Sequence, residues 1–509
     1  MSAWQDTAVT TGAGGTDVVR TYGGWRRRRG LGIGKLDGRQ SLILIVTVMT
    51  VLLTAAISLQ AALVLALPAA VLLGLTVAHW DGVWVTDAAL ARLRFARAAR
   101  AGQTSYRSGV VVDHPRAWQL PGVLSTLRCL DVEDGEGGRY GLVWDRRTGL
   151  LTATVRVAAT GTTLAEGGSA DGWVANWNAW LAGLGDEPTV RWVVVTVDTA
   201  PDPGSTLRDH VETRIDPDAP RPAQDLLRQL VDTSPSAAAT VDTRVSVTFD
   251  TDRAADRPAG LLEAAAEVSL VLRGLENGLG GCGLAVLGRA SAAEIAGAVR
   301  VAFDPAARAA VNTALARIGA GADPEELLGW ADAGPVAADE AYDSYTHDSG
   351  TSVSWALRDA PRQQVTSNVL ARLVAPGRWP RRVAMTYQVF PSEQAAKVVE
   401  AERNAASFRA AYRARTRRDE TARDTEDRIR AEQAAMEESQ GAGVVLWSTY
   451  VTTTVTDPAQ LSAAAADVEQ RAGTAKLRLR RMFGSQAAGF AASLPVGVYP
   501  PYLAGRSWR

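Results

Sequence analysis

Lysine is the first residue type to test for nucleotide chemistry, because the chain has only three: Lys35, Lys397 and Lys476. A phosphate-binding loop of the usual ATPase kind needs the pattern Gly-x-x-x-x-Gly-Lys-Ser/Thr, in which backbone amides wrap the phosphates and the lysine reaches the terminal ones. Lys35 follows Gly34 but precedes Leu36, and each of the other two lysines follows an alanine. The sequence therefore has no such loop.

Two further segments match parts of nucleotide-binding motifs, but in the wrong context. Gly278-x-Gly280-x-x-Gly283 has the spacing of a dinucleotide fingerprint, yet it follows a predicted helix and precedes a predicted strand. A dinucleotide-binding site needs the opposite order, in which a strand is followed by a helix whose N-terminus binds the pyrophosphate. We interpret this segment as a helix C-cap and turn. Val193–Asp198 is similar to the metal-coordinating strand of ATPases, but without the loop it is predicted to be a buried strand that ends in a turn aspartate.

Metal-ligating and nucleophilic residues are too few or too scattered to predict a catalytic centre. Only four histidines and two cysteines occur, and Gly-x-Ser-x-Gly is absent. Cys129 and Cys282 are interpreted as small buried side chains. The acidic cluster of residues 131–136 lacks calcium-loop spacing and is interpreted as a solvated turn. The sequence predicts no catalytic residues, no cofactor and no metal site, which favours an assembly role over an enzyme.

The composition is that of a large folded protein with unevenly distributed charge. The chain has 509 residues, a formal net charge of −1 and 47% hydrophobic residues, which is too apolar for a disordered chain. The first 110 residues carry 12 basic and 5 acidic side chains, so the remainder is net acidic. A basic N-terminal region on an acidic body suggests that the N-terminal region binds an anionic surface.

Residues 41–80 are predicted to form a transmembrane helical hairpin. This stretch has no Asp, Glu, Lys or Arg and is too long for one span of about 17–25 residues. Two apolar blocks, 41–59 and 61–78, suit two short spans with a turn near Gln60. The alternative is one long tilted helix with a kink at Pro68.

Both flanks of the hairpin are rich in arginine. The basic side chains on the two sides include Arg26, Arg27, Arg28 and Arg29, and Arg92, Arg94 and Arg97. Because positively charged flanks stay on the cytoplasmic side, we expect a multi-pass protein of the inner (plasma) membrane with both termini in the cytoplasm. A signal peptide fits poorly, because its apolar region would be shorter and closer to the N-terminus.

Residues 81–110 are predicted to contain a basic juxtamembrane helix. Asp87 can cap a helix at 88–100, where Leu90 and Leu93 lie among arginines, the pattern of a helix on anionic lipid. A soluble linker helix is an equally good interpretation.

The rest of the chain is predicted to be a cytoplasmic body of the α+β (mixed alpha/beta) class. We expect it in two parts, 111–345 and 346–509, with residues 1–40 as a basic cytoplasmic N-terminal segment. Strands are indicated by alternating hydrophobicity, and helices lie between them. The predicted strands are 140–144, 150–158, 190–197, 240–249, 284–287, 352–357, 383–390 and 444–455. The predicted helices are 172–183, 223–232, 259–276, 292–303, 305–318, 393–438 and 458–482.

A charged segment near residues 393–440 stands apart from the rest of the body. Between Glu400 and Gln440, 19 of 41 residues are charged, with both signs mixed. A helix of this length projects into solvent or forms a hairpin stabilised by i,i+4 pairs. The plainer interpretation is a solvated helix without a partner. The functional one is an arm that docks another subunit, with Arg415, Arg417 and Arg418 as candidate contacts.

Two sets of residues carry a resemblance to proteins of bacterial conjugation. Thr21-Tyr-Gly-Gly-Trp-Arg-Arg-Arg-Arg-Gly-Leu-Gly-Ile-Gly34, followed by a two-span hairpin, is similar to an actinobacterial family of conjugation-associated membrane proteins. That family is encoded with type IV secretion-like components of integrative and conjugative elements. The end of the chain, with Gln486, Phe490 and Leu494-Pro-Val-Gly497, resembles the close of the N-terminal domain of the conjugative secretion ATPase.

The resemblance implies a composite chain. Its front resembles the small two-helix inner-membrane subunit of these machines, and its body resembles the N-terminal domain of the ATPase without the motor domain expected after Pro495. It implies a non-catalytic inner-membrane subunit of a machine that transfers DNA or protein, which anchors the complex and recruits a separate ATPase. The implied partners are membrane lipid, that ATPase and other inner-membrane subunits, in a hetero-oligomer.

Two other functions remain open at this stage. One is the two-span core-complex subunit of a type VII secretion system, which the segment 486–497 argues against. The other is a membrane-tethered enzyme of a different class. The acidic body argues against a broad phosphate-binding surface and leaves direct nucleic-acid binding open.

Overall fold

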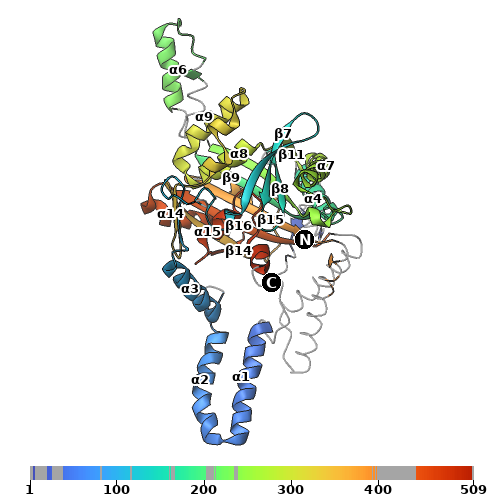
Figure 1. Cartoon of the computed structure of the whole chain (residues 1–509), viewed down its shortest axis with the longest axis vertical. Coiled ribbons are helices and arrows are strands. Elements are labelled where there is room, and N and C mark those ends of the chain that lie inside the picture. The colour runs from blue at the N-terminus through green and yellow to red at the C-terminus, as the bar shows by residue number, and fades with distance from the viewer. Residues whose placement is uncertain are drawn as a thin grey trace, which may run out of the picture.

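The computed structural model consists of a mixed alpha/beta body built on one large sheet and two apolar helices that extend from it (Figure 1). The predicted fold class is confirmed. The structure describes residues 4–5, 20–23, 25, 38–80, 83–114, 117–159, 161, 167–201, 211–212, 214–233, 239–391, 394–395, 397, 400 and 443–506. Several predicted site residues lie outside these ranges: Arg26, Arg27, Arg28, Arg29, Arg415, Arg417 and Arg418.

The hairpin consists of α1 (Gly38–Ile57) and α2 (Leu59–Val77), each long and apolar enough to cross a membrane. The two helices lie side by side (Figure 1). The turn is tighter than predicted, because Ser58 alone separates them and its hydroxyl caps α2 by accepting a backbone hydrogen bond at 3.4 Å. Gln60 therefore lies in the first turn of α2. Because the chain turns at Ser58 between two separate helices, the predicted alternative of one long helix kinked at Pro68 is wrong; Pro68 lies inside α2.

The described residues of the body form a 13-stranded sheet with antiparallel pairing throughout. Its order is β5-β12-β13-β14-β16-β15-β9-β10-β8-β7-β6, with β11 on β8 and β17 on β14. The strands are β5 (Ser105–Arg107), β6 (Leu127–Glu133), β7 (Arg139–Asp145), β8 (Leu151–Ala159), β9 (Val190–Pro201), β10 (Ala239–Phe249), β11 (Leu284–Arg289), β12 (Ala337–Glu340), β13 (Tyr345–His347), β14 (Gly350–Asp359), β15 (Arg381–Val389), β16 (Val445–Val455) and β17 (Arg478–Arg481). Strands β14, β16 and β15 of the second part lie between strands of the first part, so both parts of the body share one sheet.

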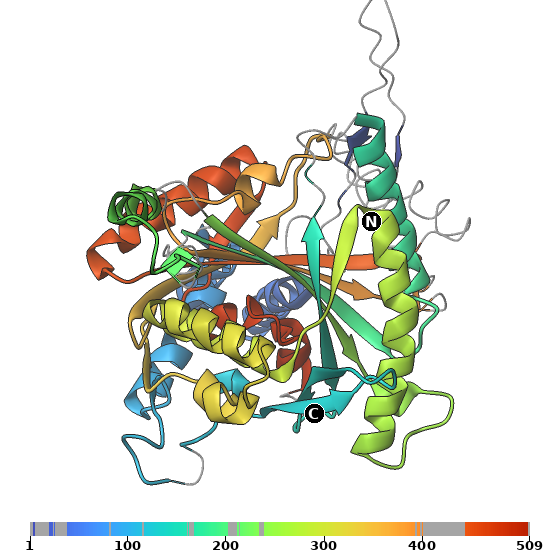
Figure 2. The same cartoon turned by 90° about the horizontal axis from the view of Figure 1, so that it is seen from above.

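Helices cover both faces of this sheet. Figure 2 shows α14 on one side of the central strands and α9 on the other. The helices of the body are α4 (Gly167–Gly183), α6 (Arg221–Thr233), α7 (Leu261–Leu279), α8 (Ala292–Phe303), α9 (Arg308–Gly319), α10 (Pro324–Leu327), α11 (Ala371–Val374), α14 (Leu461–Thr474), α15 (Gln486–Ala492) and α16 (Pro500–Arg506). One face is apolar: α4 and α7 pack over β8, β9 and β10, and α14 packs over β14 and β16.

The opposite face of the central strands is lined with buried hydroxyl groups. Because side chains alternate along a strand, the residues between the apolar ones point to this second face. Here they pair across strands, with oxygen–oxygen distances of 2.8–2.9 Å: Thr152 with Thr248, Thr154 with Ser246, Ser352 with Thr454, and Ser354 with Thr452. A hydroxyl-lined face needs a polar cover, because buried donors and acceptors left unpaired destabilise a fold.

The C-terminal segment provides that cover. Thr154 donates a hydrogen bond to the carbonyl of Pro495 at 3.1 Å, and the indole N–H of Trp192 donates to the carbonyl of Gly497 at 3.0 Å. The amide oxygen of Gln486 accepts from the backbone N–H of Ser354 at 2.7 Å. The segment quoted for the resemblance to the ATPase domain is therefore an internal part of this fold.

Glycine is required at position 497 by contact and by backbone conformation. A Cβ there would lie 2.2 Å from the hydroxyl oxygen of Thr152 and 2.6 Å from that of Thr248. The backbone φ angle is +73°, in the left-handed region that side chains disfavour. This close approach explains why the run of residues 494–497 ends in glycine.

Several predicted elements differ from the structure. The predicted helix 458–482 ends at Thr474, and its last residues form β17. Asp131 lies on β6 and not in a solvated turn, and Asp198 lies inside β9 and not at its end. Gly283 has a φ angle of +72° between α7 and β11, which confirms the turn interpretation of the glycine-rich segment.

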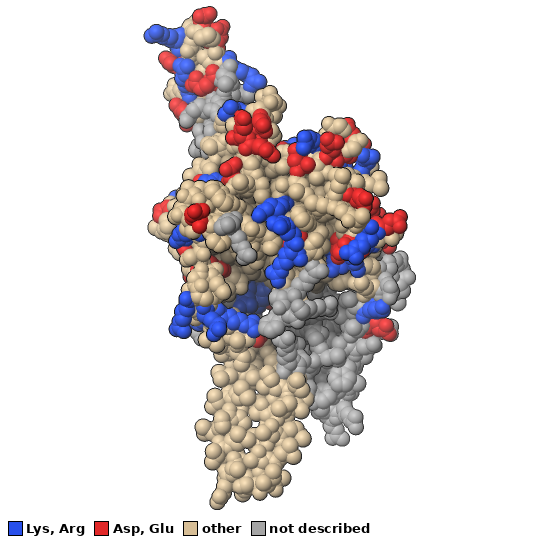
Figure 3. Space-filling view, in the orientation of Figure 1, with Lys and Arg blue, Asp and Glu red and all other residues tan. Residues whose placement is uncertain are grey.

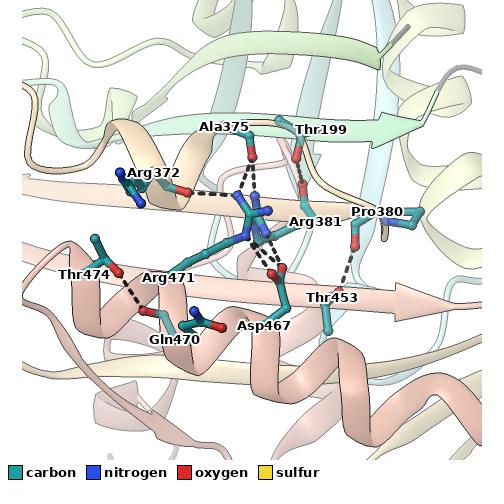
Figure 4. A network of polar contacts seen from close by, with 10 residues as sticks. All are labelled: Thr199, Arg372, Ala375, Pro380, Arg381, Thr453, Asp467, Gln470, Arg471 and Thr474. Carbon is teal, nitrogen blue, oxygen red and sulfur yellow. Dashed lines mark hydrogen bonds and ion pairs between the residues drawn. The ribbon is translucent and has the colours of Figure 1, made fainter. Parts of the chain in front are cut away.

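A buried ion-pair network fixes β15 to α14 on the apolar face (Figure 4). The guanidinium of Arg381, 1% exposed, lies 3.2 Å from a carboxylate oxygen of Asp467, and Arg471 lies 2.8 Å from the same oxygen. Arg381 also donates to the carbonyl of Ala375, and Arg471 donates to that carbonyl at 3.3 Å. Burial, aided by the charge of Arg471, lowers the pKa of Arg381 to about 10. Asp467 is thus the shared anion of two arginines.

Removing that anion tests the network. We expect Asp467→Ala to lower the free energy of unfolding by about 3–5 kcal/mol, because it leaves Arg381 as a buried cation without its carboxylate. Glu469→Ala, an exposed position on the same helix, should change it by less than about 0.5 kcal/mol. Denaturant unfolding of the full chain in detergent measures both. Equal stability of the two variants would contradict the role of Asp467.

Candidate membrane-proximal interface

The hairpin surface is apolar and exposed over most of its length. Leu52, Leu53, Leu63 and Leu67 are 59–74% exposed, as expected of side chains that face lipid rather than a protein core. Figure 3 shows a stalk free of charged side chains, with Lys and Arg gathered where it joins the body. The boundary between the apolar and basic zones lies at the start of α3 (Val85–Arg100). A short hairpin of β3 (His79–Trp80) and β4 (Val83–Trp84) joins α2 to it.

One face of α3 packs on the body. The ring of Phe95 lies 5.4 Å from that of Tyr342 in an edge-on arrangement, and the guanidinium of Arg92 lies 5.0 Å from the same ring. Phe483 stacks on Tyr342 at 5.5 Å. These contacts hold α3 between the hairpin and the sheet. Sequence reasoning did not identify Tyr342 or Phe483, because nothing in their local sequence marks them as contacts of a helix more than two hundred residues away.

The other face of α3 mixes leucine and arginine. With 3.6 residues per turn, Leu90, Leu93, Arg94, Arg97 and Arg100 fall within about 120° of one another, opposite the face that packs on the body. Leu90 is 44% exposed and Leu93 is 66% exposed. Leucines that enter the acyl boundary and arginines that reach phosphate groups are typical of a helix lying at a membrane surface. Of the predicted basic residues, Arg94 and Arg97 thus lie on the outward face and Arg92 on the inward one.

A short stretch of the N-terminal segment also contacts the body. Tyr22 exchanges two backbone hydrogen bonds with Val365, at 2.7 and 2.8 Å, and its hydroxyl donates to a carboxylate oxygen of Asp171 at 2.6 Å. The ring of Trp25 lies 6.2 Å from that of Trp447, near the start of β16. The chain therefore contacts the same body before the hairpin, through these residues, and after it, through α3.

The most buried ionisable groups lie inside the body, away from this interface. Arg382 on β15 is 6% exposed, faces Asp198 on β9, and stacks over the ring of Phe490 at 4.8 Å. Burial lowers its pKa to about 10. His347, 1% exposed, contacts the carbonyl of Phe303 at 2.5 Å and the hydroxyl of Ser352 at 2.8 Å.

These buried groups suit a structural role. Burial lowers the pKa of His347 to about 4, so its ring is neutral near pH 7. The C-terminal segment packs over Arg382, with the hydroxyl of Ser493 3.4 Å from its guanidinium. A general acid or base must reach substrate, and neither side chain is exposed to do so. Within the described ranges, no three His, Cys, Asp or Glu side chains gather closely enough to hold a metal ion.

A shallow apolar pocket of about 390 Å³ opens at another part of the body. Val110, Trp118, Leu328 and Val336 are among the residues that line it, and the hydroxyl of Ser108 is buried there with no hydrogen-bond partner within the described part of the chain. Arg300, which also lines the pocket, is held in ion pairs with Asp304 at 2.8 Å and Asp348 at 3.1 Å.

A scan against protein-family models and a search of curated proteins found no match. Among the sites described above, the membrane-proximal interface is the one that the geometry of the chain defines most clearly. It joins an apolar hairpin, a helix with leucine and arginine on its outward face, and a body that contacts both flanks of the hairpin.

The outward face of α3 can be tested with a fluorophore at Leu93→Cys in the full chain held in lipid nanodiscs. We expect its emission to shift to the blue when anionic lipid replaces zwitterionic lipid, because each arginine near an anionic surface contributes about 1 kcal/mol. Arg94→Gln, Arg97→Gln and Arg100→Gln together should abolish that shift. Arg92→Gln should retain it, because Arg92 faces Tyr342. Identical spectra in both lipids would indicate a soluble linker helix.

Proposed function

We propose that this chain is a non-catalytic inner-membrane subunit of an actinobacterial conjugative, type IV secretion-like machine. It anchors the complex through α1 and α2, presents a rigid body at the membrane surface, and recruits a separate ATPase to that body. The observation that supports this best is the attachment of the body to both flanks of the hairpin, through Tyr22 on one side and Phe95 on the other.

This double attachment supports the proposed topology. Two flanks that contact one body lie on the same side of the membrane, so a hairpin between them must cross an even number of times. The basic residues on both flanks, including Arg94 and Arg97, support a cytoplasmic location for that side by the positive-inside rule. Both termini are then cytoplasmic, and the turn at Ser58 faces outward.

The proposal that the chain is not an enzyme rests on its residues. The sequence has no phosphate-binding lysine motif, and the buried His347 and Arg382 have structural partners. The segment 486–497, which resembles the end of a domain normally fused to a motor, is used here to close the sheet. In this proposal the motor that the body serves is a separate ATPase. Its partners are this ATPase, other inner-membrane subunits in a hetero-oligomer, and membrane lipid.

The recruitment of the ATPase can be tested at the charged segment near residues 393–440, the predicted arm. Reversing Arg415, Arg417 and Arg418 to glutamate should reduce co-purification of the conjugation ATPase, and the frequency of transfer, by about tenfold, because mixed-charge contacts govern association rate and register. Binding of the ATPase to the wild-type chain should weaken as the salt concentration is raised. Protein level and membrane insertion should stay unchanged.

Changing Arg26–Arg29 to glutamine serves as the control. It should disturb insertion or orientation before it affects ATPase binding, because these residues flank the hairpin. If the arm variant binds the ATPase and supports transfer as well as the wild type does, the arm does not contact the ATPase.

A further inference from the structure

A second basic surface lies on the body itself, at the end that faces the hairpin. Its arginines belong to β17, which contains Arg478, Arg480 and Arg481 and pairs with β14. Figure 1 shows β14 at the end of the body nearest to α1 and α2. Three residues beyond Arg481, the backbone N–H of Gly484 donates to the carbonyl of Tyr342 at 2.6 Å, and Tyr342 contacts α3. β17 therefore continues directly into the membrane-proximal interface.

The side chain of Arg480 lies on the face of the sheet on which the C-terminal helix α16 packs. Arg480 pairs with Ala356 of β14, and the side chains of directly paired residues lie on the same face of a sheet. Ala356 packs in one cluster with Met482 and with Tyr502 of α16. Figure 1 shows α16, beside the mark C, at the same end of the body as β14. Arg480 is therefore at the membrane-proximal end of the body.

Arg480 has no partner for its charge among the described residues. Its side chain forms no hydrogen bond or ion pair with them, and its Nε is fully buried, whereas its two terminal nitrogens are not. The acidic side chains next to β17 are held by other arginines: Asp343 lies 3.7 Å from Arg481, and Asp359 lies 3.7 Å from Arg358. A partly buried donor without an acceptor is unfavourable, so a ligand that supplies the acceptor would bind favourably.

The phosphate of a lipid headgroup fits this position better than a soluble anion does. A guanidinium offers two parallel N–H donors that match two phosphate oxygens. Leu42 of α1 and Leu75 of α2, near the ends of the hairpin that adjoin the body, are 62% and 45% exposed. A phospholipid beside the hairpin can contact such leucines with its acyl chains while its phosphate reaches Arg480. Inorganic phosphate would use only the second contact.

We propose that Arg480, with Arg478 on the same face of β17, binds the phosphate of an anionic phospholipid next to the hairpin. This inference rests on the membrane location in the proposed function and is independent of the ATPase. It differs from the contact of α3 with lipid, because the stem of Arg480 is fixed in the body. A fixed guanidinium binds an individual lipid, whereas the exposed arginines of α3 respond to the charge of the whole surface.

The lipid that stays bound to the full chain tests this site. The chain is extracted in mild detergent from liposomes of phosphatidylcholine and phosphatidylglycerol, and native mass spectrometry counts the retained lipids. We expect the wild type to retain phosphatidylglycerol in preference to phosphatidylcholine. Arg480→Gln should retain about fivefold less phosphatidylglycerol, the factor that one arginine at an anionic lipid surface contributes to affinity. Arg480→Lys should retain an intermediate amount, because lysine keeps the charge without the two parallel donors.

The matched control is Arg317→Gln, an exposed arginine on α9, which lies toward the other end of the body (Figure 1). It should retain lipid like the wild type. The thermal unfolding midpoint of Arg480→Gln should also equal that of the wild type, because the lost side chain has no partner among the described residues. An excess of inorganic phosphate should leave the lipid bound to the wild type.

The outcomes separate this inference from the proposed function. Loss of phosphatidylglycerol in Arg480→Gln alone, with partial recovery in Arg480→Lys, supports it. Equal retention by the wild type and Arg480→Gln overturns it, as does a wild type that retains both lipids equally, and the proposed function then stands. Displacement of the lipid by inorganic phosphate would assign the site to a soluble anion and also overturn it. Release of the wild type from membranes by alkaline carbonate would contradict the membrane location on which both proposals rest.

Discussion

The structure depends on two consecutive arginines buried on opposite faces of one strand. Arg381 and Arg382 begin β15, which lies between β9 and β16 and so joins strands from distant parts of the sequence. On the apolar face Arg381 binds Asp467 of α14, and on the hydroxyl-lined face Arg382 lies against Phe490 of the C-terminal segment. Burying a cation is unfavourable unless its partners are in place. The strand therefore requires α14 and the C-terminal segment to be packed at the same time.

This constraint makes the body one unit and not two domains joined by a linker. The C-terminal segment closes the hydroxyl-lined face through Pro495, Gly497 and Gln486. Trp25, before the hairpin, contacts the body near the start of β16, and α3 contacts it at Tyr342. A body held in this way at both flanks of a hairpin that could cross a membrane would have a defined orientation to that membrane. Such an orientation fits the proposed role as an assembly platform.

Local sequence patterns were sufficient to predict an element where residues close together in the sequence determine its structure. The predicted helix 292–303 matches α8 to the residue, and Ser291 and Glu294 form a capping box at its start. The hairpin was predicted from hydropathy alone, apart from the position of its turn. The strand β15 was predicted to begin at Val383, because two adjacent arginines look like solvent-exposed residues. Only the distant Asp467 and Phe490 make their burial possible.

The same reasoning explains what was missed in the candidate interface. β17 contains three arginines in four residues and was predicted as helix, but pairing with β14 makes it a strand. Arg92, Arg94 and Arg97 were predicted as one basic group, yet the contact with Tyr342 divides them between two faces of α3. Contacts between residues hundreds of positions apart override local propensity, and a single sequence does not display them.

ATP turnover by the purified full chain in nanodiscs, measured alone and then with the separate ATPase, tests the central claim most directly. A non-catalytic platform predicts no hydrolysis by this chain alone, and saturable binding of the ATPase with turnover that belongs to the ATPase. Hydrolysis that co-elutes with this chain when the ATPase is absent would contradict the account.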